Sequence, residues 1–199
     1  KDIDSLPDRV AMARNLKADP KADQELGKGK TICLLFFNNS LRTRLSTQKA
    51  AMNLGMEVIV MNFGSEGWAL EYDDGTIMDQ GTSEHVKEAA QVVSQYCDII
   101  GIRAFAGLAY REEDEDEIVL QSFKKYATVP ILNMESSVGH PLQALADAIT
   151  LSEQNTVARP KVVLSWAPHP KALPHAVANS FVEMMQLQKD MDFVITHPE

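Results

Sequence analysis

The chain has 199 residues, 45% of them hydrophobic, which suits one large domain or two small ones with a buried core. Its formal net charge of −9 argues against nucleic acid or an anionic membrane as a partner, because both repel an acidic surface. Any anion-binding function must therefore rest on a local group of basic residues.

Strand-like and helix-like segments alternate along most of the chain. The first helix is expected at about residues 5–18, where apolar residues recur at helical spacing and Pro7 stands early. The next expected elements are strand 31–37, helix 42–54, strand 57–63, a long loop at 64–81, helix 83–96, strand 98–105, an acid-rich helix around 112–126 and strand 129–135. Apolar strands separated by helices predict an α/β fold with a doubly wound parallel sheet.

A second unit is expected to begin within or just after a long helix at about 141–154. The same rhythm then restarts, with strand 161–167, helix 174–188 and strand 192–196. We place the domain boundary near residue 150, which gives domains at 1–150 and 151–199. A unit of about 50 residues is small for a doubly wound domain, so it is either unusually small or incomplete.

The junction after the first strand carries the most specific chemistry. Residues 38–44 read Asn-Asn-Ser-Leu-Arg-Thr-Arg, so a hydroxyl group stands at the start of a helix with two arginines in its first turn. The first N–H groups of a helix lack internal partners and lie at the positive end of its dipole. With Ser40, Arg42, Thr43 and Arg44 they suit a phosphate-like dianion. The alternative is that Ser40 is only an N-cap and the arginines are solvated.

Further candidate ligands follow downstream. Arg103 stands at the end of a strand, where open α/β sheets place ligand groups. His140 and Gln143 share one side of the first turn of helix 141–154, where an imidazole could polarise a carbonyl and a carboxamide could accept from an NH2 group. His169 follows strand 161–167 in the run His-Pro-Lys. The ordinary alternatives are a surface arginine, a capping or packing histidine and a Pro-rich turn.

Metal and nucleotide motifs are absent from the sequence. The histidines show neither His-x-x-x-His spacing nor a Cys-x-x-Cys partner, and no Gly-x-Gly-x-x-Gly or Walker motif occurs. We therefore expect no metal and no cofactor.

Cys33 and Cys97 lie in apolar strand-like runs, where buried reduced thiols are expected. Without a signal peptide or long apolar span, the expected location is cytoplasmic.

These motifs resemble those of the carbamoyltransferases (transcarbamylases) of arginine and pyrimidine synthesis. Residues 40–44 (Ser-Leu-Arg-Thr-Arg) resemble the family's Ser-x-Arg-Thr-Arg carbamoyl-phosphate motif. Arg103 resembles its later arginine, and residues 140–143 (His-Pro-Leu-Gln) its His-Pro-x-Gln motif. The resemblance covers essentially the whole chain, in order, and implies two doubly wound domains, of which the second is incomplete here.

The resemblance also implies a role for each residue. Phosphate would be held by the N–H groups of residues 41–44, which include Leu41 and Arg44, and by the side chains of Ser40, Arg42 and Thr43. Arg103 would bridge phosphate and the carbamoyl oxygen, His140 would bind the same oxygen, and Gln143 would bind the carbamoyl NH2. The neutral amine of an amino acid would attack the carbonyl carbon.

Several segments resemble one branch, which uses N-acylated ornithine; they are 68–71 (Trp-Ala-Leu-Glu), 78–79 (Met-Asp), 84–85 (Glu-His) and 166–171 (Trp-Ala-Pro-His-Pro-Lys). The resemblance implies that the acetyl type carries a glutamate at the position of Ser83, and the succinyl type a small residue or proline. A carboxylate would repel the succinyl carboxylate, whereas serine can donate to it. We favour N-succinylornithine as acceptor, with N-acetylornithine, ornithine or aspartate as alternatives.

Family members are trimers or trimer-based, with shared active sites. The resemblance implies a homotrimer in which Trp68 reaches a neighbour's site, while Glu135 and His169 contact the acyl-ornithine; a structural role at a strand end is the alternative for Glu135. The family's His-Cys-Leu-Pro motif would lie beyond position 199, so we interpret the chain as a piece that should not turn over alone. The non-enzyme alternative is a non-catalytic phosphate-binding assembly module.

Overall fold

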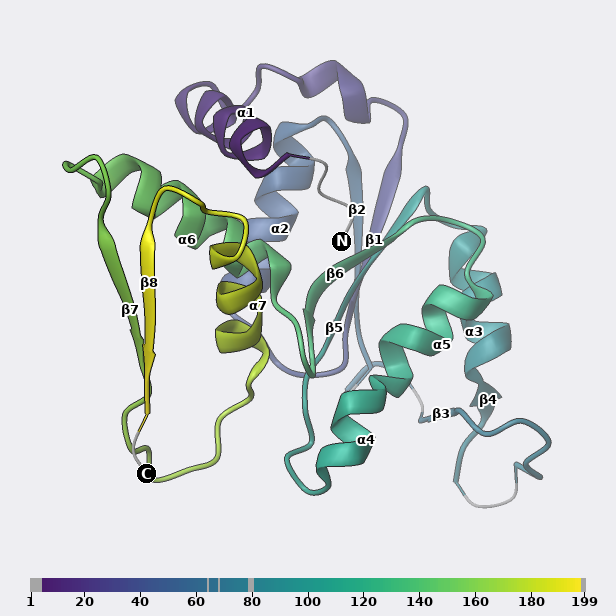
Figure 1. Cartoon of the computed structure of the whole chain (residues 1–199). Coiled ribbons are helices and arrows are strands. Elements are labelled where there is room, and N and C mark those ends of the chain that lie inside the picture. Colours follow the sequence, from purple (N-terminus) through teal and green to yellow (C-terminus); the bar gives the residue numbers. More distant parts are fainter. Residues whose placement is uncertain (1–4, 64, 68, 79–80, 198–199) are drawn as a thin grey trace.

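The structure is a computed structural model, which describes residues 5–63, 65–67, 69–78 and 81–197. Its centre is a parallel sheet of four strands in the order β2-β1-β5-β6 (Figure 1). These strands span Thr31–Phe36 (β1), Glu57–Asn62 (β2), Ile99–Ala104 (β5) and Ile131–Ser136 (β6). The central strands β1 and β5 are buried along almost their whole length, as apolar strands covered on both faces should be. The predicted α/β parallel-sheet fold is confirmed.

Helices cover both faces of this sheet. The helices of the described residues span Leu6–Ala18 (α1), Arg42–Asn53 (α2), Val86–Ser94 (α3), Arg111–Asp116 (α4), Ile118–Tyr126 (α5), Pro141–Gln154 (α6) and Ala176–Met185 (α7), with a short 3₁₀ helix at Gln24–Gly27. On one face, Val86 and Ala90 of α3 and Phe123 of α5 pack against β1 and β5. On the other, Ala51 of α2 packs beside Met134 of β6. The alternating side chains of β1 belong to these two cores in turn.

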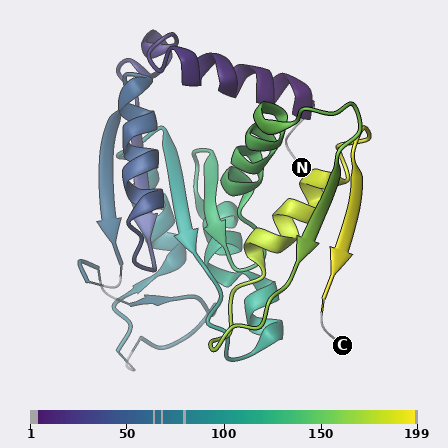
Figure 2. The same cartoon turned by 90° about the vertical axis from the view of Figure 1, so that its left-hand side faces the viewer.

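A small second sheet stands beside the first. Its strands β7 (Lys161–Ser165) and β8 (Asp192–Thr196) are parallel and are connected through α7 (Figure 2). α7 packs on α6, and this contact joins the small sheet to the rest of the chain. The joint core combines Leu6 and Val10 of α1, Ala144 and Ala148 of α6, and Met184 and Met185 of α7. The proposed boundary near residue 150 falls within α6 and stays a prediction.

The predicted helix 83–96 begins later than expected. Residues Glu84–His85 form a short strand, β4, which pairs in parallel with β3 (Leu70–Glu71) from the preceding long loop. The helix starts only at Val86, because the His85 ring accepts a hydrogen bond from the Lys87 N–H and caps it. The other predicted elements agree with the structure to within a few residues, except the acid-rich helix.

The predicted acid-rich helix around 112–126 is wrong as a single element. It is divided into α4 and α5 at Glu117, whose backbone is left-handed with φ 47°. Residues 112–117 are all acidic, and like charges three or four positions apart disfavour one continuous helix. The Asp114 carboxylate instead accepts from the N–H groups of Gly107 and Leu108, which ties α4 to the loop before it.

Cys33 and Cys97 are both buried and free, as expected, and burial raises the pKa of the Cys33 thiol to about 12. This thiol therefore stays protonated and unreactive at neutral pH.

Within the described ranges, no helix combines the length and apolar character needed to cross a membrane.

Replacing Phe123 by Ala should lower the free energy of unfolding by about 3–5 kcal/mol, because it leaves a cavity in the core. The side chain is fully buried, and its ring meets Phe37 edge to face with 6.1 Å between centroids. Urea denaturation followed by circular dichroism measures the change. The control is Ile118→Ala on the same helix, 48% exposed, for which we expect a loss below about 1 kcal/mol. Equal losses of unfolding free energy in the two variants would contradict the placement of Phe123 in the core.

Candidate active site

A cavity of about 570 Å³ opens at the carboxyl edge of the four-stranded sheet. The loop after β1, the ends of β5 and β6, and the first turns of α2 and α6 all contribute to its lining. The predicted site residues that line it are Ser40, Leu41, Arg42, Thr43, Arg103, Glu135, His140 and Gln143. Residues from five separate segments thus line one cavity, at the edge where parallel sheets place their ligands.

The amino end of α2 forms one wall. The Ser40 Oγ accepts a hydrogen bond from the Thr43 N–H at 3.2 Å, so this hydroxyl binds one of the first N–H groups of α2 from one position before the N-cap residue Leu41. Arg42 lines the cavity, but Arg44 does not. The Arg44 guanidinium instead donates to Asn62 Oδ1 at 3.1 Å, at the end of β2. Of the two arginines expected to bind the anion, only Arg42 lines the cavity.

Arg103 is the central cation of the cavity, and only 8% of its surface is exposed. Its Nε and Nη2 atoms each lie 2.9 Å from Glu135 Oε2, forming a buried ion pair. Its Nη1 donates to the carbonyl oxygens of Asn38 and Asn39, at 3.1 and 2.9 Å. The guanidinium also lies 4.5 Å from the centre of the Phe105 ring. It therefore binds the loop before α2 to the ends of β5 and β6.

His140 is the N-cap of α6. Its backbone N–H donates to the Ser180 hydroxyl of α7 at 2.8 Å, and its Nδ1 faces the Gln143 N–H at 3.4 Å. With Nδ1 as acceptor, the neutral imidazole carries its proton on Nε2, which lies 3.8 Å from Glu135 Oε2.

The pKa of His140 is lowered from its usual 6.5, mainly because burial disfavours the charged ring. The Glu135 carboxylate opposes this shift, and the Arg103 cation adds to it. At neutral pH the imidazole is therefore an uncharged donor at Nε2.

Gln143 completes the cavity on the first turn of α6. Its Nε2 donates to Asp147 Oδ1 at 2.9 Å, one turn further along the helix. With the amide nitrogen bound in this way, the carbonyl oxygen of Gln143 is free to accept from a ligand. Asp147 was not among the predicted residues, although its spacing of four positions from Gln143 could have revealed it. Ser180 could not have been found in this way, because it comes from another element.

The cavity offers complementary chemistry at its two sides. The α2 terminus, the hydroxyls of Ser40 and Thr43, and Arg42 provide donors for a dianion. His140 adds a neutral donor and Gln143 an acceptor nearby. Donors that are fixed before reaction stabilise negative charge that develops on an oxygen. Among the described residues, no cluster of three or more His, Cys, Asp or Glu side chains could hold a metal ion.

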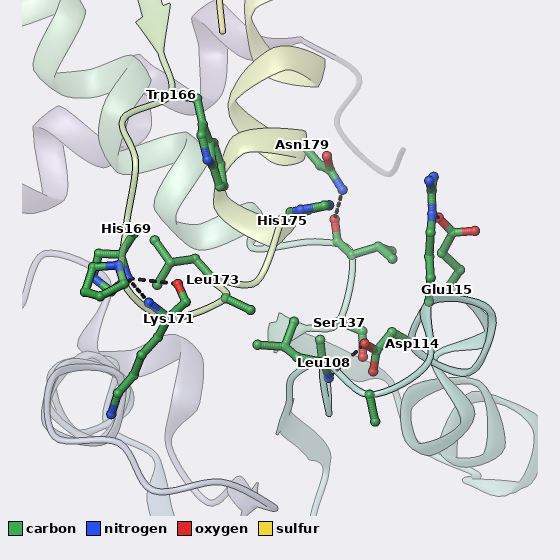
Figure 3. A pocket seen from close by; sticks show the side chains of 16 residues that line it. Leu108, Asp114, Glu115, Ser137, Trp166, His169, Lys171, Leu173, His175 and Asn179 are labelled. Carbon is green, nitrogen blue, oxygen red and sulfur yellow. Dashed lines mark hydrogen bonds and ion pairs between the residues drawn. The ribbon is translucent and has the colours of Figure 1, made fainter. Parts of the chain in front are cut away.

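Two further predicted residues, His169 and Ser83, do not line this cavity. His169 lines a separate cavity of about 540 Å³ together with Trp166 and Lys171 of the same loop (Figure 3). Its Nδ1 accepts from the Lys171 N–H at 3.2 Å. Ser83 is exposed just before β4 and does not line the first cavity. Trp68 lies outside the described residues.

The sequence model of the aspartate/ornithine carbamoyltransferase carbamoyl-phosphate-binding domain matches residues 2–153. An N-succinylornithine carbamoyltransferase of Bacteroides fragilis is 50% identical over 198 residues, which are 100% of this chain and 62% of that protein. An N-acetylornithine carbamoyltransferase of Xanthomonas axonopodis is 42% identical over 182 residues, 90% of this chain and 51% of that protein. The chain thus spans about three fifths or less of the length of these relatives.

Solved transcarbamylase structures have the same fold as this chain. An N-acetyl-L-ornithine transcarbamylase complexed with PALAO superposes with a TM-score of 0.88 at 38% identity, over 98% of this chain and 58% of that one. A glutamate-to-serine variant of N-acetyl-L-ornithine transcarbamylase, complexed with carbamyl phosphate and N-succinyl-L-norvaline, matches with the same score, identity and coverage. The resemblance inferred from the sequence motifs is confirmed, and the chain belongs to the aspartate/ornithine carbamoyltransferase family.

Proposed function

We propose that the full-length protein transfers the carbamoyl group of carbamoyl phosphate to the δ-amine of N-succinylornithine, a reaction of arginine biosynthesis. The observation that carries this proposal is the gathering of Arg42, Arg103 and His140 around one cavity at the amino end of α2. The relative at 50% identity, named for N-succinylornithine, supports the choice of acceptor over the relative at 42%, named for N-acetylornithine.

In this proposal the phosphate group lies against the first N–H groups of α2, with Ser40, Arg42 and Thr43 as side-chain ligands. Arg103 would exchange one of its present contacts to reach the phosphate and the carbamoyl oxygen. The same oxygen would accept from His140 Nε2. This arrangement holds the donor with its carbonyl carbon open to attack.

The neutral δ-amine then attacks this carbon, and negative charge builds on the carbamoyl oxygen. The new C–N bond forms, the bond from carbon to the phosphate oxygen breaks, and the leaving phosphate takes the proton released by the amine. A pre-aimed donor such as His140 is typically worth about 3–4 kcal/mol in such a step. Holding both substrates in line supplies much of the remaining acceleration, so the reaction requires no metal or covalent intermediate.

The acceptor would extend from the first cavity toward His169. A third cavity, of about 530 Å³, shares Glu135 with the first and Trp166 with the cavity of His169. This row of adjoining cavities supports Glu135 and His169 as contacts of the acyl-ornithine. Ser83, without a carboxylate, would tolerate or bind the succinyl carboxylate. The glutamate-to-serine transcarbamylase crystallised with N-succinyl-L-norvaline is consistent with this idea.

We further propose a homotrimer with shared active sites, in which Trp68 contributes to the site of a neighbouring subunit. β2 is an edge strand, and large apolar side chains exposed on it and on the α2 and α3 segments support a subunit contact in this region, since exposed apolar area favours association. These side chains are Leu45 and Met52 of α2, Ile59 of β2, Val92 of α3 and Tyr96 just after it.

Arg42→Ala should weaken carbamoyl phosphate binding about 10- to 150-fold, because charge-assisted hydrogen bonds to the dianion are lost. Isothermal titration calorimetry on the full-length protein measures this. The matched control is Arg44→Ala. This variant removes the same charge from the same helix, but the lost side chain is one that binds Asn62 and does not line the cavity. We expect less than about a threefold change for the control. Equal binding by the Arg42 variant and the natural protein would remove the proposed site.

Among ornithine, aspartate, N-acetylornithine and N-succinylornithine, the last should show the highest kcat/KM in a citrulline-type colorimetric assay. Ser83→Glu should reduce kcat/KM for N-succinylornithine at least about tenfold, through repulsion between carboxylates, and should affect N-acetylornithine much less. Faster turnover of free ornithine would defeat the acyl-ornithine proposal. Binding of carbamoyl phosphate without turnover of any acceptor would favour the non-catalytic module.

His140→Ala should lower kcat about 10²- to 10³-fold while changing carbamoyl phosphate affinity far less, because its donor acts mainly on charge that develops during reaction. In the natural protein the neutral ring should persist as pH falls through 6.5, since the pKa of His140 is lowered. Nuclear magnetic resonance titration of the ring tests this point. A midpoint above 6.5 would contradict the buried neutral imidazole.

A further inference from the structure

The side chain that fixes Gln143 lies one turn further along α6. Gln143 Nε2 donates to Asp147 Oδ1 at 2.9 Å, and Asp147 is half-buried. Asp147 does not line the cavity of Gln143 but lines the adjoining one, together with Glu135. It therefore contacts Gln143 from behind and would not touch a molecule bound in the first cavity.

This contact decides which end of the Gln143 amide faces the cavity. A carboxamide has a donor end, NH2, and an acceptor end, the carbonyl oxygen, which exchange by a half-turn about the last side-chain bond. An ionised carboxylate only accepts hydrogen bonds, so Asp147 holds the NH2 end and turns the oxygen away from itself. With a neutral partner that both donates and accepts, this preference would be lost.

We infer that Asp147 is a positioning residue that, through Gln143, selects a donor with an NH2 group on its carbonyl carbon. This inference rests on the proposed function, because it concerns the carbamoyl end of the same ligand. An NH2 group offers only hydrogens and needs an acceptor, which Gln143 presents only in the orientation that Asp147 fixes. A methyl group at the same place would cover that half-buried acceptor and leave it unpaired, and this is costly.

A simpler role for the contact predicts different behaviour. Gln and Asp at positions i and i+4 can merely stabilise a helix slightly. In that case, changing Asp147 would slightly lower the melting temperature and leave the choice between ligands unaltered. The two roles are therefore separated by ligand preference and not by stability.

The experiment compares carbamoyl phosphate with acetyl phosphate, in which a methyl group replaces the NH2 group, by calorimetry on the full-length protein. The natural protein should prefer carbamoyl phosphate, and Asp147→Asn should reduce the ratio of the two affinities at least tenfold. The variant also removes a negative charge, but both ligands are similarly charged anions, so this effect cancels in the ratio. Asp147→Ala, which frees the amide to rotate, provides a second variant and should reduce the ratio in the same direction.

Gln143→Ala is the matched control, since it removes the amide that Asp147 acts through. It should lose the preference by itself, and adding Asp147→Asn should change the ratio no further. An unchanged ratio in both folded Asp147 variants would overturn the inference, as would an equal effect of Asp147→Asn with and without Gln143. If the natural protein binds neither ligand, the proposed function fails instead.

Discussion

The buried ion pair between Arg103 and Glu135 is the interaction on which the site depends. One guanidinium joins the end of β5 to β6 through Glu135, and to the loop before α2 through the carbonyl groups of Asn38 and Asn39. Breaking such a pair leaves an uncompensated buried charge, which is strongly unfavourable. The pair therefore fixes the distance between the amino end of α2, where the anion is proposed to bind, and the ends of β5 and β6.

The fold concentrates positive potential locally in a chain whose net charge is −9. The loop after β1 leads into α2 at the carboxyl edge of the sheet, so the positive end of the helix dipole faces the same cavity as Arg42 and Arg103. Because Glu135 neutralises part of this charge, the site is only partly positive in its free state. Specificity then rests on the direction of a few donors more than on the overall field.

α6 carries the groups proposed to act on the carbamoyl end. His140 caps the helix, Gln143 lies in its first turn, and Asp147 lies one turn later on the same side. The backbone of His140 is held from outside by Ser180, whose hydroxyl accepts its N–H. A helix start supported from both sides is rigid, and rigidity is what a preorganised donor requires. Since α7 connects β7 to β8, the part of the chain after α6 helps to place the imidazole.

The sequence by itself determined the elements and the kind of chemistry. Apolar runs and helical spacing predicted the parallel strands, and Pro141 marked the start of α6 at its observed residue. The run at 38–44 predicted an anion site because caps and helix dipoles act within one turn. Local patterns of this kind can be predicted, since all the interacting groups lie within a few positions of one another.

The tertiary structure alone decided which groups meet. Arg42 and Arg44 are equivalent by sequence, yet only Arg42 faces the cavity, because Asn62 of β2 binds the other. The contact of His140 with Ser180 and that of Arg103 with Glu135 join positions 40 and 32 residues apart. Spacing fixes the direction of a side chain on its own helix or strand, but the partner it finds depends on how separate elements pack.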